Sequence, residues 1–372
     1  MKKKSAKKTS NKTVGCIVVA AGGTGGHMYP AESLAAVLKK RRKNVMLFTD
    51  QRGLDNYNGM LKDLPTVVIK AGNITGQTFK KMAININNLG LGFVHAFVQL
   101  RKAKPGVVVG FGGYASAPTV LAALILRIPV VLHEQNSVLG RVNRLFGKFV
   151  RCIAVSYPQT KLLPVGVDAN MTGMPVRQEI KDLGAKAVYK APGDKINIIV
   201  TGGSQGAAVL AKTFARAFAG MPKEIRKKLN IVQQCPEKEI ADVQEIYDEA
   251  SMDVQLTTFI QDMPKQLASA HLVMARAGAS TIAELQVLGR PAVLVPFAQA
   301  ADDHQSFNAK FLEKSQAAWV IKQSEFTVDS LDKLLEKILG SPALMETVAA
   351  NIKKLARPDA DEALANLVLA VQ

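Results

Sequence analysis

The chain has 372 residues, of which 48% are hydrophobic, and a formal net charge of +18 at pH 7. This length predicts about two domains with full cores, and no apolar run approaches the roughly 20 residues of a transmembrane helix. The three scattered cysteines form neither a disulfide framework nor a metal pair and fit a reducing cytoplasm, whereas the basic excess favours nucleic acid, an anionic membrane or a phosphorylated substrate as partner.

Residues 1–12 carry six lysines and no acidic residue, which predicts a disordered basic tail rather than a signal peptide. The apolar residues 14–21 predict a buried first strand, and a helix is expected to end near Lys40. Between them lies the glycine-rich loop GGTGGH at 22–27, which is typical of phosphate binding but has the spacing of neither a dinucleotide loop nor a P-loop. In such a loop we interpret His27 as a general base rather than as a structural histidine.

Residues 74–98 differ in composition from the strands around them. Isoleucines, phenylalanines and leucines alternate here with polar residues, and lysines and arginines flank the segment on both sides up to Lys104. Part of the segment predicts a helix packed on the sheet. An apolar surface rimmed with lysines would equally suit a membrane interface, so both interpretations stay open.

Two polar loops follow predicted strands in the same half of the chain. Gly112, Gly113 and Tyr114 come after a valine-rich run, and the sequence HEQN at 133–136 comes after another. Four polar side chains directly after a buried strand are costly unless they are hydrogen-bonded or functional. Strands that end in polar loops at one edge define the crevice where α/β folds bind ligands.

A crossover into a second domain is expected near residue 173. Residues 196–200 predict a new first strand, and TGGSQGA at 201–207 then leads into a helix. Because this arrangement echoes residues 22–27, it indicates a coarse internal duplication.

The stretch RAGASTIAEL at 276–285 lies between two apolar runs and predicts a strand, a small-residue turn and a helix. Ser280 or Thr281 is expected to cap this helix, and uncapped N–H groups there would face an anion. Glu284, one turn further on, offers a carboxylate to sugar hydroxyls; the alternative is an ordinary turn with Glu284 in solvent.

A short polar run follows the next predicted strand. Asp302, Asp303 and His304 could bind a metal, but without a further ligand pair we favour a helix start that presents Gln305 and Asn308 to sugar hydroxyls. The only Asp-x-Asp, at 359–361, lies in the C-terminal tail, which argues against a metal-dependent transferase pattern.

Taken together, these motifs resemble those of the MurG family of bacterial glycosyltransferases, in the family's order and from about residue 13 to 355. The resemblance is carried by GGTGGH at 22–27, GGY at 112–114, HEQN at 133–136, TGGSQGA at 201–207, RAGAST at 276–281 and DHQxxNA at 303–309.

The resemblance implies an α/β chain with the GT-B fold, in which two doubly wound Rossmann-like domains face each other across a cleft. The first domain would span residues 13–172 and the second 173–345, with C-terminal helices at 346–372 packing back on the first. The implied reaction is inverting transfer of N-acetylglucosamine from UDP-GlcNAc to undecaprenyl-pyrophosphoryl-MurNAc-pentapeptide (lipid I to lipid II), without a metal or other cofactor.

The resemblance also implies the site residues. Glu284 would bind the ribose, Ile260 the uracil, and Ser204 the nucleotide phosphates. The acceptor pyrophosphate would lie against Gly112, Gly113 and Tyr114, and His27 would be the base, tuned by Glu134. The whole donor site would comprise Thr24, Gly25, Gly26, Asn136, Arg177, Ser204, Ile260, Ala279, Ser280, Thr281, Glu284 and Gln305.

A lipid-linked acceptor implies docking at the cytoplasmic face of the bacterial membrane. The matching surface would be residues 74–104, and the lysine tail would add on the order of 1 kcal/mol per lysine near an anionic bilayer. The resemblance further implies contacts with the cell-wall or division machinery.

Two other functions, a UDP-GlcNAc epimerase and a diacylglycerol glycosyltransferase, remain as alternatives to this transferase. A nucleic-acid-binding protein explains the charge but not the loops, and only 6% of the residues are aromatic; a dehydrogenase fails on the glycine spacing.

Overall fold

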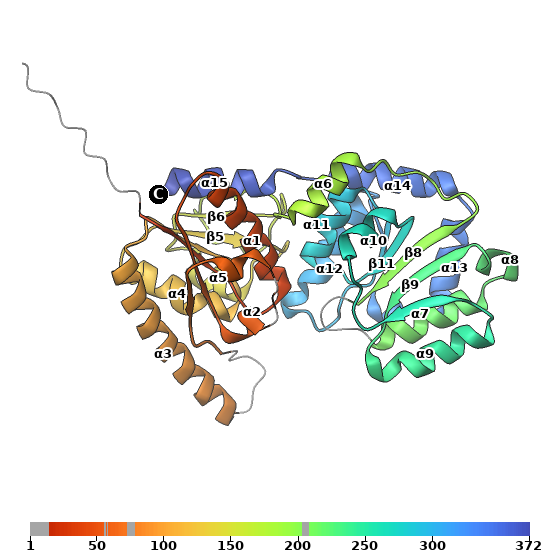
Figure 1. Cartoon of the computed structure of the whole chain (residues 1–372), viewed down its shortest axis with the longest axis horizontal. Coiled ribbons are helices and arrows are strands. Elements are labelled where there is room, and N and C mark those ends of the chain that lie inside the picture. The colour runs from red at the N-terminus through yellow and green to blue at the C-terminus, as the bar shows by residue number, and fades with distance from the viewer. Residues whose placement is uncertain (1–14, 56, 58, 73–78, 203–207) are drawn as a thin grey trace, which may run out of the picture.

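The computed structural model describes residues 15–55, 57, 59–72, 79–202 and 208–372, which form two α/β domains side by side (Figure 1). The predicted lysine tail, Ile74 and Ser204 lie outside these residues. The α/β class and the two doubly wound domains are confirmed.

Within the described residues, the first domain contains a parallel sheet of seven strands in the order β3-β2-β1-β4-β5-β6-β7. Its central strands are short apolar runs because helices cover both faces. The strands span Ile17–Ala20 (β1), Val45–Thr49 (β2), Thr66–Val68 (β3), Val107–Gly110 (β4), Val130–Glu134 (β5), Cys152–Val155 (β6) and Ala169–Met171 (β7). The helices span Gly25–Lys40 (α1), Gln51–Asp55 (α2), Phe79–Ala103 (α3), Gly113–Ile125 (α4) and Arg141–Phe146 (α5), with a 3₁₀ turn at Met60–Asp63.

The second domain repeats this architecture with a six-stranded parallel sheet, again counted over the described residues, in the order β10-β9-β8-β11-β12-β13. The strands span Ile196–Thr201 (β8), Leu229–Gln234 (β9), Val254–Thr257 (β10), Leu272–Ala275 (β11), Ala292–Leu294 (β12) and Trp319–Val320 (β13). The helices span Gln178–Lys186 (α6), Ala208–Gly220 (α7), Lys223–Arg226 (α8), Glu237–Glu249 (α9), Met263–Ser269 (α10), Ala279–Leu288 (α11), His304–Lys314 (α12), Val328–Leu339 (α13) and Pro342–Lys354 (α14), with 3₁₀ turns at Ala301–Asp303 and Gln323–Glu325. A further helix, Ala360–Val371 (α15), follows them in the chain.

The strand order reverses once in each sheet, between β1 and β4 and between β8 and β11. At such a switch point the loops after the two neighbouring strands part, and the space between them is where doubly wound sheets bind ligands. The loops after β1 and β4 carry GGTGGH and GGY, and the loop after β11 carries RAGAST. The topology therefore brings motifs that are far apart in sequence to the sheet edges where ligands bind.

The chain crosses between the domains twice, and the last helix returns to the first domain (Figure 1). Leu364, Ala365 and Val368 of α15 are buried in the same apolar cluster as Leu34 and Leu38 of α1. The C-terminal segment expected at 346–372 is divided, because α14 packs against the second domain and only α15 packs against the first.

Helix α3 lies along the outer flank of the first domain (Figure 1). Ala96 and Leu100 on its inner face are buried in the core, whereas Leu91, Val94 and Val98 on its outer face are between 43% and 58% exposed. In the part of the chain that the structure describes, no helix combines the length and the apolar character that crossing a bilayer would require.

Candidate active site

The glycine loop after β1 is held in place by Asp50, which directly follows β2. The Asp50 Oδ1 atom accepts hydrogen bonds from the backbone N–H groups of Gly23 (2.9 Å) and Gly53 (3.0 Å). Thr24 is the N-cap residue of α1, but its side chain makes no capping hydrogen bond. The N–H groups of the first turn of α1, which contains Gly25 and Gly26, therefore have no cap, and this is the usual geometry of an anion site.

His27 lies in the first turn of α1, against the glycine loop that follows β4. Gly113 has a φ angle of +70°, and a Cβ atom at that position would lie 3.2 Å from His27 Nε2. Both the backbone conformation and the close approach favour glycine there. The structure thus brings His27 together with the predicted acceptor loop Gly112–Tyr114.

The electrostatics of His27 suit a proton acceptor. Burial lowers the pKa of its imidazole, and the negative charge of Glu134 acts in the opposite direction. Its Nδ1 atom is buried and has no hydrogen-bond partner among the described residues. With its pKa below the ordinary value the ring is neutral at pH 7, as a general base has to be.

Glu134 organises the loop after β5. Its Oε1 atom accepts hydrogen bonds from the backbone N–H (3.0 Å) and side-chain amide (3.3 Å) of Asn136, and Oε2 accepts from the Gly140 N–H (2.8 Å) and Asn143 Nδ2 (2.9 Å). Both carboxylate oxygens are thereby occupied, so Glu134 influences His27 through its charge and not through a hydrogen bond. Its geometry is that of a residue that positions Asn136.

His133, which precedes Glu134, is fully buried and ties the loop to the crossover between the domains. Its Nε2 atom lies 3.1 Å from the carbonyl oxygen of Gly173, and burial lowers its pKa to about 4. This histidine is neutral at physiological pH and is structural.

Asn308 joins the two domains through a buried side-chain amide. Its Oδ1 accepts hydrogen bonds from the backbone N–H (2.9 Å) and hydroxyl (2.8 Å) of Ser137, and its Nδ2 donates to Asn136 Oδ1 (3.0 Å) and the Ala277 carbonyl (3.2 Å). The interpretation of Asn308 as a ligand for sugar hydroxyls is wrong, because its hydrogen-bonding groups already bond protein atoms. Asn136 shares this bridge through its Oδ1 atom, while its own Nδ2 donates to Glu134 Oε1.

Gln305 lies on the same turn of α12 and is oriented by the main chain. Its Oε1 accepts a hydrogen bond from the Phe297 N–H at 3.0 Å, which leaves its Nε2 without a partner in the described structure.

Asp302 pairs with Arg144 Nη2 at 2.6 Å and Arg141 Nε at 3.5 Å across the domain interface. Among the described residues, no three His, Cys, Asp or Glu side chains gather as a metal site would require.

The N-terminus of α11 differs from the prediction. The helix begins at Ala279 and its N-cap is Gly278, with no side-chain cap, so neither Ser280 nor Thr281 caps it. The helix starts too early for these residues, which lie inside its first turn. The Ser280 hydroxyl is buried and lacks a hydrogen-bond partner in the described part of the chain. An orphan hydroxyl beside uncapped N–H groups is a suitable place for a phosphate.

Glu284 is buried and paired, not solvated. Arg177 donates to its Oε1 atom through both Nε (2.9 Å) and Nη2 (2.7 Å), and the Arg177 guanidinium lies 4.9 Å from the ring centroid of Tyr29 in the first domain. Burial raises the pKa of Glu284, and the charge of Arg177 partly offsets that effect. Two predicted donor residues therefore bind each other in this structure.

The predicted uracil contact, Ile260, is 3% exposed and packs in the core of the second domain. Its side chain is therefore unavailable to a base, and a contact there would have to use main-chain groups. The neighbouring Phe259 is 72% exposed. The sequence does not indicate this exposure, because Phe259 lies at the end of an apolar run that predicts a strand.

Comparison with known proteins identifies the family. Residues 17–155 match the Glycosyltransferase family 28 N-terminal domain, and residues 197–364 match the Glycosyltransferase family 28 C-terminal domain. A UDP-N-acetylglucosamine–N-acetylmuramyl-(pentapeptide) pyrophosphoryl-undecaprenol N-acetylglucosamine transferase of Paramagnetospirillum magneticum is 45% identical over 361 residues, which cover 95% of this chain and 96% of that protein. The crystal structure of Acinetobacter baumannii MurG superimposes with a TM-score of 0.75 at 30% identity, covering 95% of this chain and 99% of that one. This chain belongs to the MurG family.

Other comparisons agree with this membership. The Caulobacter vibrioides protein with the same transferase name is 39% identical over 367 residues, covering 94% of this chain and 97% of that protein. The UDP-GlcNAc 2-epimerase of Neisseria meningitidis has a TM-score of 0.65 but 12% identity, a likeness that shows the fold alone. The GT-B fold implied by the MurG resemblance is thus confirmed.

The pairing of Arg177 with Glu284 predicts a pH-dependent loss of stability in Arg177→Ala. Because the folded-state pKa of Glu284 is raised, its ionisation destabilises the fold as the pH rises, and Arg177 offsets this cost. Urea unfolding should therefore show a loss in the variant that is about 2 kcal/mol larger at about pH 8 than at about pH 5.

The double variant Arg177→Ala/Glu284→Gln is the control, because a neutral amide at position 284 does not titrate. Its stability relative to the wild type should change little between the two pH values. If Arg177→Ala lost the same free energy of unfolding at both pH values, Arg177 would not be what offsets the cost of ionising Glu284.

Proposed function

We propose that this chain transfers N-acetylglucosamine from UDP-GlcNAc to undecaprenyl-pyrophosphoryl-MurNAc-pentapeptide, converting lipid I to lipid II in peptidoglycan synthesis. The observation that carries the proposal is the position of His27, a neutral imidazole set against the Gly113 loop at the switch point of the first sheet. The transferase of Paramagnetospirillum magneticum, 45% identical along almost its whole length, supports the choice of substrates.

In the proposed donor site the diphosphate meets the uncapped N-terminus of α11. The N–H groups of Ala279, Ser280 and Thr281 and the orphan Ser280 hydroxyl are the donors available to it. The ribose hydroxyls would bind the carboxylate of Glu284, and the free Nε2 of Gln305 would donate to the transferred sugar. Ile260 would contribute main-chain groups to the uracil. Ser204, in the loop after β8, remains a donor-site prediction outside the described residues.

The proposed reaction inverts the configuration at the anomeric carbon. The acceptor hydroxyl loses its proton to His27 as its oxygen forms a bond to that carbon, and the bond to the UDP oxygen breaks with its electron pair leaving on UDP. The positive end of α11 and the guanidinium of Arg177 would stabilise the charge that develops on the diphosphate. The first turn of α1, with Thr24, Gly25 and Gly26, would complete the site from the first domain.

The proposal is tested by incubating the protein with labelled UDP-GlcNAc and a short-chain analogue of the lipid-linked muramoyl-pentapeptide in the presence of a chelator. Labelled sugar should move to the acceptor as UDP is released. Epimerised sugar, or UDP release without transfer, would favour the epimerase or a hydrolase instead.

His27→Ala should bind UDP-GlcNAc with nearly unchanged affinity while kcat falls by about 10²–10⁴-fold, since only proton transfer is lost. Titration calorimetry gives the affinity, and the same transfer assay gives kcat. Because the pKa of His27 lies below 6.5, the wild-type kcat should fall only on the acid side of that value, as the base becomes protonated.

The exposed His95 on α3 provides a matched control, and His95→Ala should keep wild-type turnover with the short-chain acceptor. If His27→Ala lost UDP-GlcNAc affinity and kcat to the same extent, the assignment of His27 as the general base would be wrong.

We further propose that the outer face of α3 docks on an anionic membrane surface. Ile84, Leu91, Val94 and Val98 recur at helical spacing and are all more than 40% exposed. The exposed Lys81 and Arg101, at either end of this stripe, would face anionic headgroups. A peripheral position at the membrane follows from this proposal. The cytoplasmic face, like contacts with the cell-wall and division machinery, stays a prediction from the resemblance.

Val94→Glu should weaken binding to vesicles that contain anionic phospholipid, because a carboxylate would meet both hydrocarbon and like charge. It should also lower turnover of a long-chain lipid acceptor but not of the short-chain analogue. Val188, in the second domain, is 77% exposed, so Val188→Glu is the matched control and should leave vesicle binding intact. Equal vesicle binding by both variants in co-sedimentation would rule out the α3 surface.

A further inference from the structure

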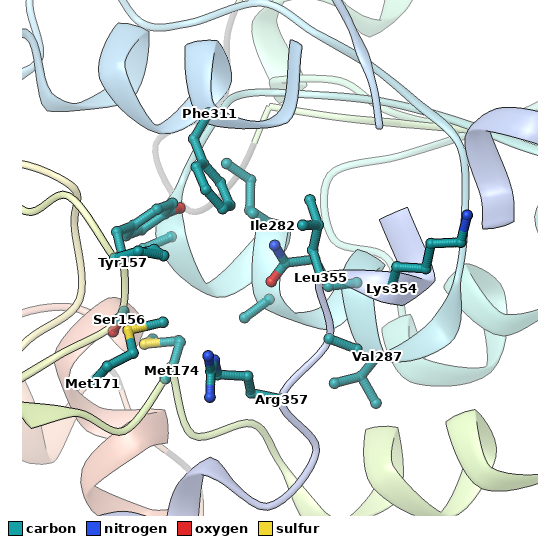
Figure 2. A pocket seen from close by; sticks show the side chains of 16 residues that line it. Ser156, Tyr157, Met171, Met174, Ile282, Val287, Phe311, Lys354, Leu355 and Arg357 are labelled. Atoms are coloured by element: carbon teal, nitrogen blue, oxygen red, sulfur yellow. The ribbon is translucent and has the colours of Figure 1, made fainter. Parts of the chain in front are cut away.

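A cavity of about 350 Å³ lies between the two domains, beside both segments of chain that cross between them. Tyr157 and Met171 line it from the first domain, and Met174 lines it from the first crossing segment. The second domain contributes one face of α11 and Phe311 of α12, and residues 354–357 of the returning segment close the cavity (Figure 2).

The cavity is separate from the proposed ribose site, although both adjoin α11. Ala279, Ile282, Ala283 and Gln286 line the cavity and recur at helical spacing, so they share one face of the helix. At 100° per residue, Glu284 lies roughly 150° around the helix from the centre of that face. The carboxylate of Glu284 points instead to Arg177, so a molecule in the cavity would not occupy the ribose position.

The cavity combines apolar walls with polar groups that lack protein partners. Tyr157 is 5% exposed, yet within the described part of the chain its hydroxyl has no hydrogen-bond partner, and burial raises its pKa so that it remains a donor. The side chains of Gln286 and Arg357 are likewise unpartnered among the described residues. A hydroxyl that opens into a cavity without a protein partner is available to a ligand or to water.

Charge reaches the cavity from Arg357, a solvent-exposed residue among those that line it. Figure 2 shows its guanidinium beside Met174, at the edge of the lining side chains, whereas the side chain of Lys354 extends away from them. The volume is within the range of small-molecule sites, which are mostly apolar with a few placed polar groups. An unpaired guanidinium in such a site selects an anionic group.

We propose that this cavity is a second ligand site, for a small amphipathic anion whose apolar body packs between Met174 and Ile282 and whose acidic group pairs with Arg357. The occupant would touch both crossing segments and α11 at once. The site goes beyond the transfer reaction, because none of its polar side chains is required by the proposed donor or acceptor contacts.

Decanoate below its micelle concentration is the probe, with titration calorimetry on the full chain as the readout. One molecule should bind per chain, and decanol, which has the same body without the charge, should bind at least about tenfold more weakly. Inorganic phosphate, which has the charge without the body, should also bind at least about tenfold more weakly. Arg357→Met should weaken decanoate binding by at least about tenfold.

Lys354→Met is the matched control, because it removes the same charge from a neighbouring lining residue whose side chain extends away from the cavity. It should change decanoate affinity by less than about twofold. Absence of saturable decanoate binding, equal binding to Arg357→Met, or decanol or phosphate binding as tight as decanoate would overturn the proposal. None of these readouts depends on transferase activity, so failure here leaves the proposed reaction standing.

Discussion

The parallel direction of the strands is the constraint on which the rest of the molecule depends. Because the strands described in each sheet run the same way, their carboxyl ends gather at one edge, and each return connection passes over a face of the sheet. Both faces are then covered, which demands the apolar valine and isoleucine runs. The loops at the carboxyl edge do not have to fill the core and can carry the glycine motifs. Glycine is required there because a side chain at position 22 would approach Asp50 too closely, and one at position 113 would crowd His27.

Polar contacts specify how the two domains meet. The amide of Asn308 bonds the Asn136–Ser137 loop, Asp302 bonds Arg144, and the Ser33 hydroxyl donates to the carbonyl of Val176 at 2.9 Å. A buried polar group left without a partner costs about 1–3 kcal/mol, whereas an exchanged hydrogen bond changes the free energy by only about 0.5–1.5 kcal/mol. A misaligned interface would leave these polar groups unpaired, so one relative position of the domains is favoured. The interface can still open when water or a substrate replaces the interdomain hydrogen bonds.

Local patterns predicted the first strand of each domain, the positions of the glycine loops and the end of α1. The run at 196–200 became β8, and α1 ends at Lys40 as expected. These features depend on residues close in sequence. The arrangement of the two domains across a cleft came from the family resemblance and not from local patterns.

The pairs at the site could not be predicted in this way. Arg177 and Glu284 are 107 residues apart, and Ser137 and Asn308 are 171 apart, so no local pattern reveals that each satisfies the other. The start of α11 was missed because Ser280 has the stronger capping propensity, whereas the helix already begins at Ala279 with Gly278 as its N-cap. Burial of Ile260 was missed because its position at a strand end does not tell whether its side chain faces the core or the cleft.

The return of α15 to the first domain has a consequence for synthesis on the ribosome. Leu364, Ala365 and Val368 complete the apolar cluster that contains Ile17 and Leu34, so the first domain is not a continuous stretch of the chain. During translation the face of α1 that α15 covers stays exposed until α15 leaves the exit tunnel, after the whole second domain has been made. The first domain to be synthesised is therefore the last to be completed, and a chain that stalls before residue 360 presents an open apolar face to chaperones and proteases.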